Sequence, residues 1–358
     1  MANKKDIRAL SLDDLKTFFT DHGDKAFRAK QVYEWLWQKS VRSFEEMGNL
    51  SKQNRELLNE NFVINAVAID SYQKSKDRTI KNAFRLYDGN IVEGVLIPNM
   101  DRMTACISSQ VGCSLTCKFC ATGRLKRLRN LNADEIYDQV VLIRDQSVEK
   151  YKTNLTNIVY MGMGEPLLNY SNVLKSIEKI TSAEGLNMSP QRITVSTAGI
   201  SKMIKKLGDD NVKFNLALSL HAANDEKRNK IMPINEQNSL DSLAEALKYF
   251  HEKTGTRVTY EYIIFKNFND ELEDAKELAM FCKVIPCKVN IIEYNPIDEG
   301  GFQQADEVKV NAFVKYLEDN GVIVNVRRSR GKDIDAACGQ LANKNKGAFK
   351  TRKLKIEA

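Results

Sequence analysis

The chain has 358 residues, of which 42% are hydrophobic and 28% are charged, a balance typical of a folded globular protein and not of a disordered one. Its formal net charge of +7 is modest for this length. No apolar run is long enough to cross a bilayer, and the N-terminus lacks an apolar signal core, so we expect a cytoplasmic protein without membrane attachment.

The first 62 residues carry helical patterns. Apolar residues recur at helical spacing in segments 12–22, 26–39 and 52–62. Ser11 and Ser51 are expected to cap the first and third helices, and Gly23 is expected to end the first. We therefore predict a small helical accessory domain over residues 1–62.

The pattern changes to strands between residues 63 and 102. The sequence Asp88-Gly89-Asn90 is a good hairpin turn, and a strand-like run follows it at 91–97. We predict a β-hairpin linker or extension here, between the helical domain and the main domain.

Strands and helices alternate over residues 103–330, which predicts βαβ units and an α/β fold with a parallel sheet. The repeats fit an incomplete barrel, with a doubly wound open sheet as the alternative. Residues 331–358 form a last segment with a basic tail. The expected strands are 104–109, 157–161, 192–196, 214–220, 258–265, 289–294 and 322–326, and the expected helices include 133–145, 240–253 and 271–281.

The seven cysteines do not suggest a disulfide framework, because their number is odd and the expected compartment is reducing. Cys113, Cys117 and Cys120 have the spacing C-x3-C-x2-C, which supplies three thiolates to a [4Fe–4S] cluster and leaves one iron open. A structural zinc site is the alternative, but zinc needs a fourth ligand and histidine is scarce. The aromatic Phe119 before the last cysteine is typical of radical S-adenosylmethionine (SAM) enzymes.

Polar residues follow the predicted strands at the ends where a barrel builds its pocket. The run MGMGEP resembles the superfamily's contact to the SAM amino group, because glycines allow close approach and a carboxylate accepts hydrogen bonds from an ammonium. The candidate SAM-binding residues are Gly164, Glu165, Ser196, Ser219, Leu220, His221 and Asn295.

Taken together, the motifs resemble the RlmN/Cfr family of radical SAM RNA adenine methyltransferases over nearly the whole chain. They are CISSQVGCSLTCKFCATG, MGMGEPLLN, STAG, LALSLHA, MPIN, EYNP and DIDAACGQL, in this order. The resemblance implies a radical SAM (incomplete TIM-like) barrel, a [4Fe–4S] cluster on the three cysteines, and SAM as the second cofactor.

The same resemblance implies roles for three further residues. Cys338 would be methylated by one SAM through nucleophilic displacement, which requires a thiolate. A radical derived from a second SAM would then activate this methyl group for addition to an adenine ring carbon. Cys106 would resolve the adduct through a transient disulfide with Cys338, and Glu93 would act as proton acceptor. Without the resemblance, Glu93 would be interpreted as a solvent-facing strand carboxylate.

Partners follow from the resemblance and from charge. Basic clusters at 124–129 (RLKRLR), 327–330 and 344–355 are typical of a polyanionic partner. The family implies 23S ribosomal RNA and tRNA as substrates, a flavodoxin- or ferredoxin-type electron donor, and a monomer. Val111 favours RlmN-type methylation at C2 over Cfr-type methylation at C8. A non-catalytic iron–sulfur RNA-binding protein is the alternative from another class.

Overall fold

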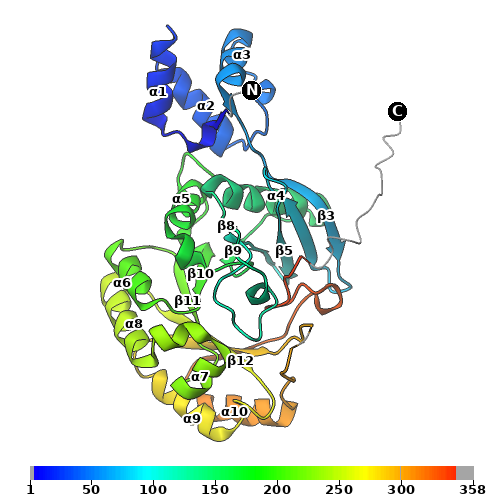
Figure 1. Cartoon of the computed structure of the whole chain (residues 1–358), viewed down its shortest axis with the longest axis vertical. Coiled ribbons are helices and arrows are strands. Elements are labelled where there is room, and N and C mark those ends of the chain that lie inside the picture. The colour runs from blue at the N-terminus through cyan, green and yellow to red at the C-terminus, as the bar shows by residue number, and fades with distance from the viewer. Residues whose placement is uncertain (1–3, 299, 344–358) are drawn as a thin grey trace.

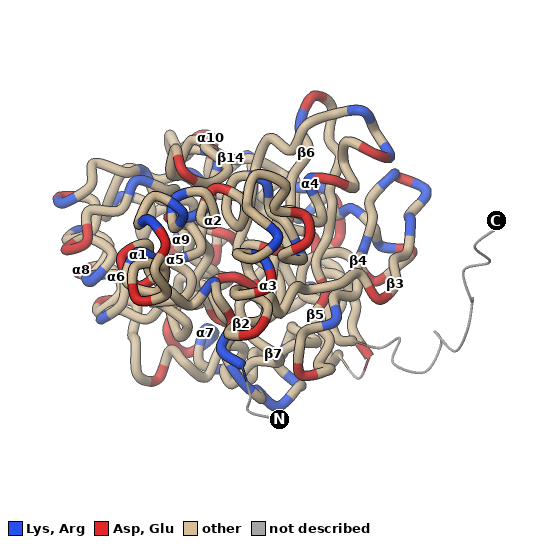
Figure 2. The backbone as a smooth tube through the Cα atoms, turned by 90° about the horizontal axis from the view of Figure 1, so that it is seen from above, with Lys and Arg blue, Asp and Glu red and all other residues tan. Residues whose placement is uncertain are grey.

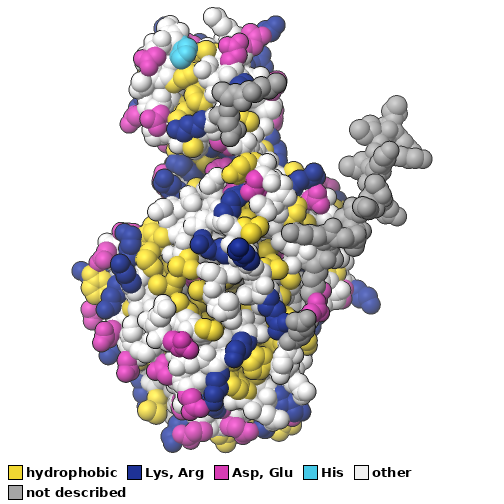
Figure 3. Space-filling model, viewed as in Figure 1, with side chains coloured by type: hydrophobic (Ala, Val, Ile, Leu, Met, Phe, Trp, Pro, Cys, Tyr) yellow, Lys and Arg dark blue, Asp and Glu magenta, His cyan; other side chains and the backbone are white. Residues whose placement is uncertain are grey.

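The structure, a computed structural model, describes residues 4–298 and 300–343 and contains a small helical lobe and a larger α/β body (Figure 1). A narrow waist joins the lobe to the body on the face drawn in Figure 3. The lobe contains α1 (Leu12–Asp21), α2 (Phe27–Trp37) and α3 (Lys52–Asn61), and β1 (Lys5–Asp6) pairs in parallel with β2 (Phe62–Val63) at its base. The three helices lie within two residues of their predicted bounds, whereas the predicted basic tail is outside the described residues.

The caps of the lobe helices form as the sequence predicts. The Ser11 hydroxyl accepts a hydrogen bond from the backbone N–H of Asp14 at 3.1 Å, and the Asp14 carboxylate accepts one from the Ser11 N–H at 2.9 Å. Gly23 follows α1 with a φ of +76°, a conformation that costs glycine little. Ser51 accepts a hydrogen bond from the Asn54 N–H at 3.2 Å. Local chemistry therefore defines these helix ends.

The body is built on a ten-stranded sheet in the order β14-β13-β12-β11-β10-β9-β6-β5-β4-β3. All neighbours from β6 to β14 pair in parallel, and this part of the sheet is the predicted partial barrel, which is confirmed. Its strands are β6 (Arg102–Cys106), β9 (Asn157–Tyr160), β10 (Ile193–Thr197), β11 (Asn215–Ser219), β12 (Val258–Ile264), β13 (Cys287–Glu293) and β14 (Val324–Arg327). A short antiparallel pair, β7 (Gln110–Val111) and β8 (Arg129–Asn130), brackets the cysteine loop.

Helices cover the outer face of the curved sheet (Figure 1). No described helix is long and apolar enough to cross a membrane. The helices are α4 (Ala133–Tyr151), α5 (Tyr170–Thr181), α6 (Ser201–Asp209), α7 (Asp225–Ile231), α8 (Leu240–Thr254), α9 (Leu272–Phe281) and α10 (Glu307–Asp319).

The segment 63–102 is an extension of the main sheet and not a separate linker. The strands β3 (Ala68–Lys74), β4 (Ile80–Arg85) and β5 (Ile91–Asn99) pair antiparallel, and β5 then pairs antiparallel with β6 of the barrel. The hairpin turn at 88–90 is present as predicted. The sequence left a linker and an extension as alternatives, because nothing within the segment shows that the free edge of β5 pairs with a later strand.

A buried cation joins the base of the lobe to the body. The Arg8 guanidinium pairs with Asp6 at 3.3 Å, with Asp134 of α4 at 3.1 Å and with Asp138 of α4 at 2.8 Å. Arg8 is only 8% exposed, so water screens these charges poorly. Burial raises the pKa of Asp134 to about 7, and the charge of Arg8 opposes this shift.

Replacing this cation is expected to weaken the fold. Arg8→Met leaves two buried carboxylates, Asp134 and Asp138, and the half-buried Asp6 without this counter-charge, and we expect a loss of about 3–5 kcal/mol in the free energy of unfolding. Urea denaturation followed by circular dichroism measures it. The control Lys16→Met removes an exposed ion pair to Asp13 and should cost less than about 1 kcal/mol. Equal losses in the two variants would contradict the structural role of Arg8.

Candidate active site

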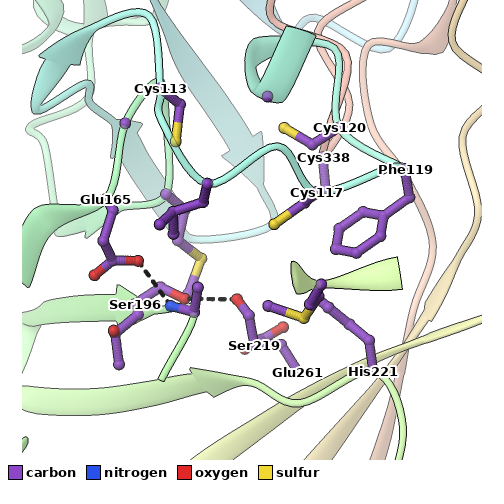
Figure 4. A pocket seen from close by; sticks show the side chains of 18 of the residues that line it. Cys113, Cys117, Phe119, Cys120, Glu165, Ser196, Ser219, His221, Glu261 and Cys338 are labelled. Carbon is purple, nitrogen blue, oxygen red and sulfur yellow. Dashed lines mark hydrogen bonds between the residues drawn. The ribbon is translucent and has the colours of Figure 1, made fainter. Parts of the chain in front are cut away.

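A cavity of about 160 Å³, the main cavity of this site, lies at the carboxyl ends of the parallel strands, where a barrel places its site. In Figure 4 the thiols of Cys113, Cys117 and Cys120 lie on one side of this space, with Glu165 and the serines of the strand ends facing them. Its lining also includes Leu115, Phe119, Tyr160, Met161, Gly162, Gly164, Ser196, Ser219, His221, Met232, Glu261, Ile263, Ile292, Cys338 and Gly339.

Three neighbouring segments fix the cysteine loop. The Cys113 N–H donates to the carbonyl of Leu125 at 3.3 Å, and the Lys118 N–H donates to that of Ile231, the last residue of α7, at 3.0 Å. The Ala121 N–H donates to Gly339 at 2.7 Å. All three cysteines are free and half-buried, and burial raises the pKa of Cys113 to about 11. Thiols in this environment become thiolates readily only when a cation binds them.

Glu165 is a buried carboxylate without a cation in the described part of the chain. Its two oxygens accept hydrogen bonds from the backbone N–H groups of Ala198 at 2.7 Å and Leu167 at 3.0 Å. Burial raises the pKa of Glu165 above its usual value. Next to it, Gly164 has a φ of +101°, and a Cβ at this position would come within 2.5 Å of Gln110. Position 164 therefore requires glycine. The carboxylate of Glu165 beside it suits a positively charged group of a ligand.

Two hydroxyls and an uncharged histidine complete the far wall. The hydroxyls of Ser196 and Ser219 lie 3.3 Å apart on adjacent strands. The His221 Nδ1 accepts a hydrogen bond from the Ile263 N–H at 3.1 Å, so a neutral ring carries its proton on Nε2. Burial, together with the charge of Arg228, lowers the pKa of His221 to about 3. The ring packs edge-on against Phe119 at 4.7 Å.

A second cavity of about 120 Å³ adjoins the first and brings Cys106 and Cys338 together. Cys338 lines both cavities, whereas Cys106, at the end of β6, lines only the second. Burial, and then the neighbouring Cys338, raises the pKa of Cys106 to about 12, so it rests as a thiol at neutral pH. Val95, Ile97, Ile292 and Leu341 give this cavity apolar walls, and residues 327–330 add arginines.

The segment that carries Cys338 is held across the mouth of the barrel by contacts on both sides. The Asn295 side chain donates to the Cys338 carbonyl at 3.4 Å, and the Gln340 side chain donates to the Pro296 carbonyl at 3.0 Å. On the other side, the Thr122 hydroxyl donates to the Leu341 carbonyl at 2.5 Å. These contacts place Cys338 beside the cysteine loop despite its distance in sequence.

Glu93 lines neither cavity. It is 3% exposed on β5, and its Oε2 accepts the backbone N–H groups of Ala342 at 2.8 Å and Asn343 at 3.1 Å. Its other oxygen lies 3.7 Å from the Lys81 ammonium. The carboxylate therefore anchors the Cys338 segment, and the interpretation as a solvent-facing residue was wrong.

Two predicted SAM contacts also lie outside the main cavity. Leu220 is completely buried, its N–H donates to the Glu261 carbonyl and its own carbonyl accepts from Arg228. Its side chain therefore belongs to the core. Asn295 contacts the Cys338 segment, although its buried Oδ1 has no hydrogen-bond partner in the described structure.

Sequence reasoning missed Glu261, which lines the main cavity from the middle of β12. Its carboxylate accepts from the Asn290 side chain at 2.7 Å and pairs with Arg327 of the second cavity at 3.2 Å. The only signal was a single carboxylate within the apolar strand VTYEYII, where every residue is buried. A charged residue in such a strand needs a partner or a ligand.

The comparisons with known proteins agree with this geometry. Residues 5–64 match the family described as ribosomal RNA large subunit methyltransferase N-terminal domain, and residues 107–279 match the radical SAM superfamily. A protein of Cytophaga hutchinsonii named "Probable dual-specificity RNA methyltransferase RlmN" is 65% identical over 341 residues, which cover 95% of this chain and 93% of the relative. The chain belongs to the RlmN family of radical SAM RNA methyltransferases.

Other RlmN relatives and a crystal structure extend the match. The Salinibacter ruber protein of the same name is 45% identical over 97% of this chain and 96% of its own. The crystal structure of a radical SAM methyltransferase from Sphaerobacter thermophilus superimposes with a TM-score of 0.89 at 36% identity, covering 94% of this chain and 99% of that chain. The recognised family and the partial barrel are thereby confirmed.

The residues of the site fit the two cofactors of radical SAM enzymes, a [4Fe–4S] cluster and SAM. Three free thiols on one wall are the donors that such a cluster takes, each on a different iron. In the described residues no group of three or more histidine, cysteine or acidic side chains converges to hold a single metal ion. Opposite, the cation-free Glu165 and the two serine hydroxyls suit the charged amino-acid end of SAM.

Proposed function

We propose that this RNA methyltransferase modifies C2 of one adenine in 23S ribosomal RNA and C2 of an adenine in the tRNA anticodon arm, through an S-methylcysteine at Cys338. The observation that carries the proposal is that Cys338 lines both cavities, one together with the cysteine loop and the other together with Cys106. The name that these relatives share, dual-specificity RNA methyltransferase, supports RNA of two kinds as substrates.

The residues that would bind the cluster and SAM lie on opposite walls of the main cavity. A cluster on Cys113, Cys117 and Cys120, when bound with SAM, supplies reductive cleavage of SAM to a carbon-centred radical. Glu165 would accept a hydrogen bond from the SAM ammonium, because two backbone N–H groups and the Thr197 side chain occupy three of the four lone-pair sites of its carboxylate. Ser196 and Ser219 would bind polar groups of the same ligand.

Cys338 and Cys106 carry the covalent chemistry in this proposal. The Cys338 thiolate would attack the SAM methyl group, forming an S–CH₃ bond as the S–CH₃ bond of SAM breaks. After a hydrogen atom is removed from this methyl group, the carbon would add to the adenine ring. The adduct would lose the proton of the attacked ring carbon to Glu93 and one electron to the redox cofactor. Cys106 would then attack the Cys338 sulfur as a thiolate, forming a disulfide as the carbon–sulfur bond to the product breaks, and the released carbon would take up a proton to become the methyl group. The shared second cavity supports this pairing.

RNA would bind over the mouth of the barrel. Of the four basic residues in 124–129, Arg129 pairs with Glu135 at 2.7 Å and with Asp88 at 2.6 Å, so it stabilises the fold. Arg124, Lys126 and Arg127 are exposed next to the cysteine loop. Lys and Arg alternate with Asp and Glu over much of the backbone in Figure 2, so this local run is more informative than the net charge. Phosphate contacts of this kind give salt-dependent affinity without base specificity.

The decisive experiment is mass spectrometry of nucleosides from 23S ribosomal RNA and tRNA after anaerobic reaction with the reconstituted enzyme, SAM and reduced flavodoxin or ferredoxin as electron donor. We expect 2-methyladenosine in both RNAs. 8-Methyladenosine would replace the proposal with Cfr-type chemistry, and cluster binding without 5′-deoxyadenosine would replace it with a non-catalytic RNA-binding protein.

Glu165→Gln tests the SAM-binding wall. Loss of the negative charge should weaken SAM binding roughly ten- to hundredfold, because hydrogen bonds to charged groups contribute about 1.5–3 kcal/mol. Equilibrium dialysis with the cluster-loaded protein measures the affinity. Glu178→Gln, which removes an exposed carboxylate on α5, is the matched control and should leave it unchanged. Equal affinities in the two variants would exclude the proposed contact.

Glu93→Gln tests the proton acceptor. A neutral amide cannot take a proton, so we expect methylated RNA to form at least about 100-fold more slowly, while 5′-deoxyadenosine still forms. Both products are quantified in the same reaction by liquid chromatography. Because the carboxylate anchors the Cys338 segment here, its role as a base requires release from the N–H groups of residues 342 and 343. Unchanged methylation by this variant would leave Glu93 with the anchoring role alone.

A further inference from the structure

Arg228 is a fully buried cation without a carboxylate in ion-pair contact among the described residues. It lies on α7, and its guanidinium donates to the carbonyls of Ala198 at 2.6 Å, Leu220 at 3.0 Å and Ser219 at 3.1 Å. Its remaining hydrogen bond goes to the Asn235 side-chain oxygen at 2.5 Å. The nearest negative charge along this network is Asp225, which accepts from the other end of the Asn235 amide.

This arrangement is unusual within the molecule. The other strongly buried arginine, Arg8, has three carboxylate partners, and the half-buried Arg129 has two. A buried charge is costly unless an opposite charge compensates it. Burial lowers the pKa of Arg228 to about 10, so the guanidinium remains charged at neutral pH. A buried cation that neutral groups alone solvate indicates that an anion belongs nearby.

The main cavity is the place where that anion would bind. The end of α7 contacts the cysteine loop directly beside Cys117, where the Lys118 N–H donates to the Ile231 carbonyl at 3.0 Å. The carbonyls that Arg228 holds follow or end β10 and β11, and Ala198 and Ser219 line the cavity itself. The guanidinium therefore lies directly behind the wall that joins the cluster cysteines to the strand ends.

We propose that Arg228 is a positioning residue, which holds the backbone at the ends of β10 and β11, and that its charge is the fixed counter-charge of the iron–sulfur cluster and favours the reduced state of the cluster. This inference rests on the proposed function in that Cys113, Cys117 and Cys120 hold the cluster. Reduction adds one negative charge to a group already carrying three thiolates, and a fixed cation in a poorly screened interior stabilises that charge. Net charge and hydrogen bonding around a cluster are among the factors that set its potential.

The test is a redox titration of the anaerobically reconstituted full chain, followed by electron paramagnetic resonance of the reduced cluster. At a fixed solution potential, Arg228→Gln should show an at least tenfold lower ratio of reduced to oxidised cluster, which corresponds to a midpoint about 59 mV more negative for a one-electron couple. Arg228→Lys, which keeps the charge, should stay near the wild type. Arg144→Gln on the outer side of α4 removes a half-exposed guanidinium and is the matched control.

A second variant tests the same inference if Arg228→Gln does not fold. Asn235→Asp keeps the arginine but places a carboxylate against it, so the ratio of reduced to oxidised cluster should fall, as it should in Arg228→Gln. An unchanged potential in an iron-loaded Arg228→Gln or Asn235→Asp protein would overturn the inference and leave Arg228 a structural residue. Failure of the proposed ligands gives a different result, since the wild type would then not acquire four irons or Cys117→Ala would retain them.

Discussion

Replacing Cys338 with alanine is expected to abolish RNA methylation while reductive cleavage of SAM stays measurable. The alanine cannot accept a methyl group, so product formation should fall by roughly a thousandfold or more, as for other covalent nucleophiles. The cluster cysteines and Glu165 lie on other elements, and the backbone contacts that hold this segment use carbonyls that alanine keeps. Methylated nucleoside and 5′-deoxyadenosine, measured in one anaerobic reaction, report the two steps separately.

The matched control is Cys282→Ala, which removes a buried thiol at the end of α9 that lines neither cavity. It should retain methylation if the protein folds, because its sulfur takes no part in the proposed chemistry. Full methylation by Cys338→Ala would refute the methyl-carrier role. Loss of both methylated RNA and 5′-deoxyadenosine would instead show that the Cys338 side chain is needed for SAM cleavage, which would contradict the separation of the two steps.

The parallel half of the fold could be predicted because each of its strands is a short apolar run between helical patterns. β12, for example, is buried at every position and reads as continuous hydrophobic sequence apart from Glu261. The cysteine loop could also be predicted, because its three cysteines lie within eight residues. By contrast, the antiparallel extension depends on the pairing of β5 with β6, and the partner of a strand edge is not encoded locally.

The parts of the site that sequence could not supply are those made by long-range contacts. Glu93 was identified only by resemblance, and its anchoring of residues 342 and 343 joins segments about 250 residues apart. Arg228 sits in the charged helix DEKRNKI, where it reads as one more solvated cation, yet it is completely buried. Helical charge patterns predict exposure, and only the tertiary fold shows which cation points inward.

Replacing Cys117 with alanine is expected to abolish the whole activity, because it removes a proposed ligand of the cluster. A [4Fe–4S] cluster held by three thiolates has no spare protein ligand in this loop, so the reconstituted variant should contain little iron and lack the visible absorption of the cluster. Neither 5′-deoxyadenosine nor methylated RNA should form. Iron analysis and absorption spectra test the ligand directly, and the two product assays test its consequence.

The matched control replaces Cys287, which is half-buried at the start of β13, on the far side of the barrel from the cavity. Cys287→Ala should keep its iron and its activity. The half-buried Cys117 lies in a loop whose N–H contacts to Leu125, Ile231 and Gly339 do not involve its side chain. The fold should therefore survive the substitution, and circular dichroism verifies this. A folded Cys117→Ala protein with a complete cluster would show that the iron has another third ligand, and the assignment of C-x3-C-x2-C would then be wrong.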